Sequence, residues 1–139
     1  DIRMAMYCAE ALAKISRSKP TLLIGYETEI LACLTTSNRS EVRGPLALVV
    51  PRLALNSALK KNAIRLMFDC LDDDSRVLRE RVYTALAEVS TEDISVLDKI
   101  VPLLSSRLGV ADQVERAKAR KLLATIALSG ASVTSVAMR

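Results

Sequence analysis

The sequence contains no histidine and no tryptophan, and aromatic side chains make up only 3% of its 139 residues. The absence of histidine excludes a Cys/His zinc site and a histidine acting as acid or base in catalysis. Half of the residues are nevertheless hydrophobic, so Leu, Ala, Val and Ile must fill the interior, as in closely packed helices. No uncharged apolar run approaches the roughly 20 residues that a membrane-spanning helix requires.

Cysteines are also few, and each lies within an apolar helical pattern. Cys8, Cys33 and Cys70 form an odd set without a histidine partner, which indicates buried, reduced thiols in a cytoplasmic or nuclear protein. No hydroxyl or thiol has a neighbouring base that would activate it as a nucleophile. We therefore expect no enzyme activity, no catalytic residue, no cofactor and no metal site.

Two short stretches mark helix ends. The acidic stretch "DCLDDDSR" (69–76) lacks the alternating ligands, the glycine and the final glutamate of a calcium loop. We expect it to be a polar turn in which Asp73 or Asp74 caps the next helix. Pro45 fits the first turn of a helix, whereas Pro51 is predicted to bend that helix or to end it early.

One helical pattern recurs along the chain at an interval of 36 to 38 residues. Its apolar residues fall at i, i+3, i+4 and i+7, the spacing of the buried stripe of an amphipathic helix. The four segments with this pattern are residues 5–15, 43–53, 79–89 and 116–126. A second helix type, around Ile30, Met67 and Leu104, shares the interval. Two helix types with one period predict an all-α repeat array.

Stacking gives the repeats their stability, because one helical hairpin cannot bury both of its apolar faces. We expect a single α-solenoid domain over residues 1–129, with about three and a half repeats of roughly 37 residues. Its parts are a lone last helix at 1–18 and complete repeats at 19–55, 56–91 and 92–129. We expect Ile2, Met6 and Ala9 of the lone helix to pack on a preceding repeat of a larger protein. Residues 130–139 lack an apolar period and are predicted to be a disordered tail.

The segment "KIVPLLSSRLGVAD" (99–112) resembles an armadillo repeat, in which a short first helix turns before a longer second one. "NAIRLMFDCLDDDS" and "GYETEILACLTTSN" are similar in the same register, which places Gly25, Asn62 and Lys99 at the turn. HEAT repeats are a close alternative, since Asp73 and Arg79 match their turn aspartate and second-helix arginine. Either resemblance implies a right-handed α–α superhelix with a concave groove, and armadillo is slightly favoured.

Peptide-binding armadillo proteins carry a ladder of asparagines along the groove, which clamps the backbone of an extended peptide. The matching positions of this chain are Lys14, Arg52, Glu88 and Thr125, and the accompanying tryptophan positions are Glu10, Leu48, Thr84 and Lys121. The ladder is absent. Binding of basic peptides in the manner of a nuclear import receptor is therefore not expected, and the net charge of +4 argues in the same direction.

These features predict a scaffold or adaptor that binds a protein partner along the concave face of the array. The residues expected to contact the partner are Arg79, Tyr83, Arg116, Arg120 and Lys121. Two alternatives remain open: binding of RNA or an acidic membrane through the basic C-terminal repeat, and the substrate-recruiting armadillo region of a ubiquitin ligase, which the resemblance also implies. Uncapped repeat ends would additionally permit self-association.

Overall fold

The computed structural model describes residues 1–110 and 112–137, and the side chains of residues 1–109 and 112–129. This part of the chain is all-helical and contains no strand, which confirms the all-α part of the predicted fold class. The α-helices are α1 (Ile2–Ser18), α2 (Glu27–Thr36), α3 (Ser40–Val49), α4 (Ser57–Cys70), α5 (Arg76–Glu92), α6 (Leu97–Val110) and α7 (Gln113–Ala137). Short 3-10 helices are η1 (Pro20–Leu23), η2 (Val50–Arg52) and η3 (Ile94–Val96).

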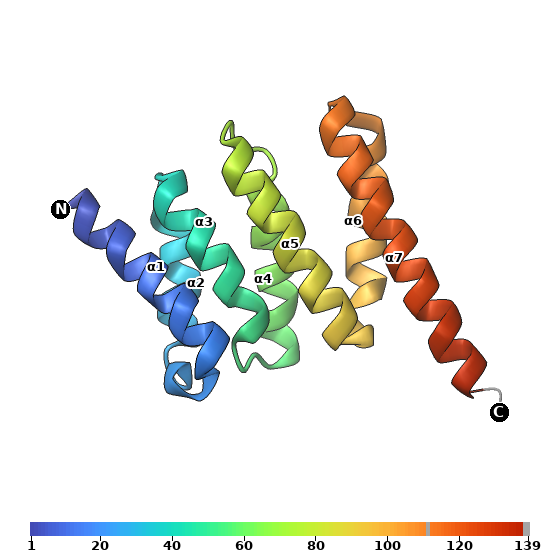
Figure 1. Ribbon diagram of the computed structural model, residues 1–139, viewed down its shortest axis with the longest axis horizontal. Helices are drawn as coiled ribbons and strands as arrows, with labels where there is room; N and C mark the ends of the chain where they lie inside the picture. The colour runs from blue at the N-terminus through green and yellow to red at the C-terminus, as the bar shows by residue number, and fades with distance from the viewer. Residues whose placement is uncertain (111, 138–139) are drawn as a thin grey trace. The chain divides into compact units, whose positions relative to one another are not determined.

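The helices group into two compact units, Asp1–Leu86 and Ala87–Arg139, and the boundary falls inside α5. The sequence predicted a single domain over residues 1–129. In the first unit, α1 and α3 lie side by side, and α2 and α4 lie behind them (Figure 1). In the second unit, α6 packs on α7.

α1 begins at Asp1, whose carboxylate accepts a hydrogen bond from the backbone N–H of Arg3 at 3.0 Å. Its buried residues Ala9, Ala13 and Ser16 follow helical spacing and lie on the side that packs on α3. Their small side chains allow the two helix axes to approach closely. This corrects the expectation that Ala9 faces outward, because Ala9 is only 2% exposed.

Only one of the three predicted inter-helix turns occurs. Gly25 separates η1 from α2 and has a φ of 97°, a conformation that suits glycine. The carboxylate of Glu27 accepts a hydrogen bond from the Gly25 N–H at 2.9 Å and holds this turn. Asn62 and Lys99 instead lie inside α4 and α6, which corrects the prediction. Neither residue adopts a positive φ, and α4 and α6 continue without a turn at these positions.

The two prolines of segment 43–53 behave differently. α3 ends at Val49 and continues as the 3-10 helix η2, which contains Pro51. This confirms that Pro51 ends the helix early, since proline cannot donate the hydrogen bond of a continuing helix. Pro45 lies inside α3 rather than in its first turn and is buried.

The turn before α5 is held by Asp73 and Ser75 together. The Ser75 hydroxyl caps α5 by accepting from the N–H of Leu78 at 3.2 Å, and Asp73 accepts from the N–H of Ser75 at 2.8 Å. Asp73 therefore positions the cap, and Ser75 supplies it, where the sequence predicted Asp73 or Asp74 in that role.

In the second unit, an ion pair links α6 to α7. Asp112 caps α7 by accepting from the N–H of Glu115 at 2.8 Å, and the Arg107 Nη2 of α6 lies 2.7 Å from the Glu115 carboxylate. α7 runs to Ala137, whereas residues 130–139 were predicted to be a disordered tail. Residues 130–137 contain no proline, and a single glycine costs a helix only about 1 kcal/mol. Residues 138–139 lie outside the described part of the chain.

Candidate binding surfaces

The helices of the recurring first pattern share a face in the first unit. Arg81 on α5 lies with its Nη1 3.4 Å from the carboxylate of Glu10 on α1. To reach it, the Arg81 side chain passes over Gly44 of α3, where an added Cβ would lie 3.2 Å from Arg81 Cδ. α1, α3 and the adjoining part of α5 are thus aligned side by side, with α3 between the other two (Figure 1). We call this surface the Arg81 face. Glu10 and Arg81 form its ion pair, and we include Arg52, which contacts α1 through Ser16.

Arg52 is fixed by a neighbour on α1. Its Nη1 donates to the hydroxyl of Ser16 at 3.0 Å, and that hydroxyl donates to the Ala13 carbonyl at 2.7 Å. Ser16 is buried, whereas Arg52 is half-buried. The Arg52 guanidinium is therefore held in one orientation at the edge of the Arg81 face, a property that favours recognition of a planar carboxylate.

Arg79 and Tyr83 lie one turn apart on α5 in the first unit, and neither is fully exposed. The Arg79 Nη1 donates to the backbone carbonyl of Asp73 at 2.6 Å, so its guanidinium closes the turn before α5. Tyr83 is 7% exposed. This corrects the expectation that its ring stands open to a partner, because a buried ring serves packing first.

Arg116, Arg120 and Lys121 are all exposed on α7 in the second unit. Arg116 and Arg120 are four residues apart and share one side of the helix. Arg107 of α6 is neutralised by Glu115; the two side chains are only 16% and 8% exposed. The predicted basic cluster of this unit therefore lies on α7, and Lys99 of α6 is a further exposed cation. The five predicted residues fall into two groups, in different units.

Glu10 and Arg81 were not predicted to form a pair. The resemblance matched Glu10 to a tryptophan position and Arg52 to an asparagine position of the armadillo groove, and this alignment was the signal that could have located the face. The contact itself was not predictable, because Arg81 and Glu10 are 71 residues apart in sequence.

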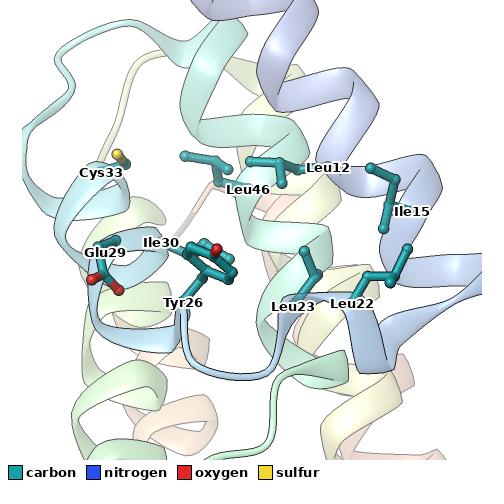
Figure 2. A pocket seen from close by; sticks show the side chains of 9 residues that line it. All are labelled: Leu12, Ile15, Leu22, Leu23, Tyr26, Glu29, Ile30, Cys33 and Leu46. Atoms are coloured by element: carbon teal, nitrogen blue, oxygen red, sulfur yellow. The ribbon is translucent and has the colours of Figure 1, made fainter.

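An apolar pocket of about 420 Å³ opens in the first unit (Figure 2). It lies between α1, η1, α2 and α3. Its lining is formed by Leu12, Ile15, Leu22, Leu23, Tyr26, Glu29, Ile30, Cys33 and Leu46. Glu29 is the single charged side chain among these residues. The pocket suits an apolar group, with one carboxylate at its edge to select the charge of a ligand.

The three cysteines differ in exposure. Cys8 and Cys33 are exposed, and only Cys70 is buried, which corrects the expectation of three buried thiols. Burial raises the pKa of the Cys70 thiol, and the positive charge of Arg43, which donates to its sulfur at 3.0 Å, acts in the opposite direction. Cys70 is therefore a protonated, structural thiol near neutral pH.

Within the described helices, none has the length and apolarity needed to cross a membrane. No protein-family model, no curated protein and no solved structure matches the chain. The surfaces themselves are therefore the basis for a functional assignment.

Proposed function

We propose that the chain is a protein–protein interaction module, a scaffold or adaptor whose aligned helices bind a protein partner. The observation that carries this proposal is the span of Arg81 across Gly44 to Glu10. It unites α1, α3 and α5 in one surface with half-exposed charges of both signs. Such a preorganised surface suits recognition of side chains and backbone groups of another protein.

The proposal includes the architecture. We infer that the helices continue as a right-handed armadillo/HEAT-type superhelix of about three and a half repeats. The glycine turn between η1 and α2 supports the armadillo type in the first repeat, and the uninterrupted α4 supports the HEAT type in the second. A cytoplasmic or nuclear location agrees with the free cysteines.

Arg81 and Arg52 are the residues we expect to contribute most to partner binding in the first unit, because arginines held by neighbours lose little entropy on binding. Arg116, Arg120 and Lys121 of the second unit are the other residues that we expect to contact a partner. Arg79 and Tyr83 shape α5 and its preceding turn.

Affinity capture from a cell extract tests the proposal with matched charge reversals on one helix. Arg81→Glu removes the Glu10 contact and reverses the charge of the face, whereas Arg76→Glu makes the same change at a side chain that is 70% exposed and pairs only locally with Glu80. We expect wild type and Arg76→Glu to retain a defined protein at low and moderate salt, and Arg81→Glu to lose it. Equal retention by all three chains would contradict the proposal.

A second candidate function is binding of a phosphate-rich ligand, RNA or an acidic membrane, by α7. The exposure of Arg116, Arg120 and Lys121 favours it. Phosphate contacts give an affinity that falls steeply with salt, and Arg116→Glu/Arg120→Glu would abolish it while Arg81→Glu would not. Retention of nucleic acid or acidic vesicles alone, lost at moderate salt, would replace the scaffold proposal by this one.

A further inference from the structure

Several residues that line the apolar pocket of the first unit have equivalents 37 or 38 residues later in the chain, and these equivalents are buried. At the interval of 37 residues, Tyr26, Ile30 and Cys33 correspond to Ala63, Met67 and Cys70. The later three are at most 1% exposed, in a helix that packs against α2. Tyr26, by contrast, is 59% exposed, and Cys33 is exposed as well, whereas Ile30 is 5% exposed and therefore covered. The chain's own helices thus cover this surface of α4 and leave the equivalent surface of α2 open on both sides of Ile30, at Tyr26 and Cys33.

The α1 wall of the pocket shows the same difference. Leu12 and Ile15, which line the pocket (Figure 2), are half-buried. At an interval of 38 residues they correspond to Val50 and Leu53, which are 2% and 7% exposed. Both walls therefore contain positions whose equivalents 37 or 38 residues later are covered by helix packing. We infer that the pocket fits an α-helix with an apolar stripe.

Charge restricts the helix that fits. Residues 20–36, which form η1 and α2, carry two carboxylates and neither lysine nor arginine. The carboxylate of Glu27 is engaged by the Gly25 N–H, and that of Glu29 lies exposed at the pocket's edge. A complementary helix would place one cation within its apolar stripe, opposite Glu29.

α7 carries such a stripe on its outward side. Its exposed members Val114, Ala117, Lys121, Ala124 and Leu128 follow one another at i, i+3, i+7, i+10 and i+14. The residues that α7 buries, Ala119, Leu122 and Ile126, lie on the opposite side of the helix. Val114 is 50% and Leu128 is 75% exposed, so the stripe is open along about 21 Å of helix. Lys121 is its single charge and stands at its centre.

We propose that the pocket binds α7 of a second copy of this chain, with Lys121 of that copy opposite Glu29. The pocket and the α7 stripe are different surfaces, and each copy offers both. Two copies can therefore bind reciprocally, each with its α7 in the pocket of the other, or further copies can add in series. Association depends on concentration in either case. This self-association uses surfaces other than the Arg81 face, although Lys121 also belongs to the α7 residues proposed for partner binding.

Sedimentation of the purified full chain over a concentration series tests the proposal. We expect the weight-average mass to exceed 15.1 kDa and to rise with concentration, also at moderate salt, because most of the contact is apolar. Glu29→Lys and Lys121→Glu should each weaken association about tenfold by placing like charges together. Glu41→Lys and Lys99→Glu, the same charge changes at exposed positions outside both surfaces, should leave it unchanged.

Mixing the two weakened variants separates a lost contact from a lost fold. In the mixture, Lys at position 29 meets Glu at position 121, and the native pair forms at the other contact, so association should return. Leu22→Ser and Leu128→Ser remove apolar area from the pocket and the stripe, and Val77→Ser is their control at a comparably exposed residue. A wild-type chain that stays monomeric at all concentrations, or a mixture that fails to recover, would overturn the proposal.

Discussion

The guanidinium of Arg43 lies 3.1 Å from the carboxylate of Asp73, which follows 30 residues later in the chain. The two side chains are 18% and 24% exposed. The same Asp73 accepts from the N–H of Ser75 through its other oxygen, and its carbonyl accepts from Arg79. One residue thus ties α3 to the turn after α4 and sets the start of α5. The Arg81 face depends on this tie, because it positions α5 beside α3.

Asp73→Ala should lower the free energy of unfolding by about 2 kcal/mol, because it leaves the half-buried Arg43 without its carboxylate and removes the support of the Ser75 cap. Asp74→Ala is the matched control at an exposed neighbour and should change stability by less than about 0.5 kcal/mol. Urea unfolding followed by circular dichroism measures both. Equal effects of the two substitutions would show that the Arg43 pair contributes nothing specific.

Gly44→Ala tests whether Arg81 is free to move. Alanine favours a helix over glycine by about 1 kcal/mol, but its Cβ would crowd Arg81 Cδ. The Arg81 side chain is 33% exposed and can swing into solvent at the loss of a weak ion pair. We expect a net stabilisation of about 0.5 kcal/mol, rising to about 1 kcal/mol when Arg81→Ala removes the crowding. An identical effect in both backgrounds would mean that the two residues do not interact.

Glu115→Gln should destabilise the second unit, because it leaves the guanidinium of Arg107 with a neutral neighbour in a largely buried site. Removing one member of such a pair costs about 3 kcal/mol. Hydrogen exchange is the suitable measurement: protection should fall in α6 and α7 and remain unchanged in α1 and α3. Glu92→Gln, at an exposed position, is the control. Loss of protection throughout the chain would argue against a local effect.

Features set by residues close together in the sequence could be predicted, and features set by contacts between distant segments could not. Helix periodicity is local, so it identified the helices and the early end at Pro51. The turn at Gly25 was predicted from the family resemblance and occurs, whereas Asn62 and Lys99 were misplaced because the resemblance outweighed their ordinary helical propensity. Tyr83 shows the limit for the site: an aromatic residue on an amphipathic helix reads equally well as a binding residue or as core.

Contacts between distant segments could not be predicted from the sequence. Nothing local indicates that Arg81 meets Glu10, that Glu115 neutralises Arg107, or that Cys33 is open while its repeat equivalent Cys70 is closed. Each of these depends on which helix lies alongside, and a single sequence contains no record of that pairing.

Thiol titration provides a direct check on burial. Cys8 and Cys33 are exposed, whereas Cys70 is buried. In the native protein a thiol reagent should therefore label two groups rapidly, and the third should react only after unfolding. Cys33→Ala should remove one rapid group and Cys70→Ala the slow one. Three rapid groups would mean that the packing around Cys70 opens readily.

The pH dependence of stability should also depend on Cys70. Burial raises the pKa of this thiol above its ordinary value of 9.0, with Arg43 acting against the rise. The unfolded chain therefore releases its proton first as pH increases, and the stability that Cys70 contributes below the ordinary pKa is lost as pH rises through the higher folded one. Wild type should therefore exceed Cys70→Ala in free energy of unfolding, measured with urea, by a smaller amount at about pH 10 than at about pH 7. A widening gap for Cys70→Ala would instead show that Arg43 outweighs burial and that the thiolate is the form the fold prefers.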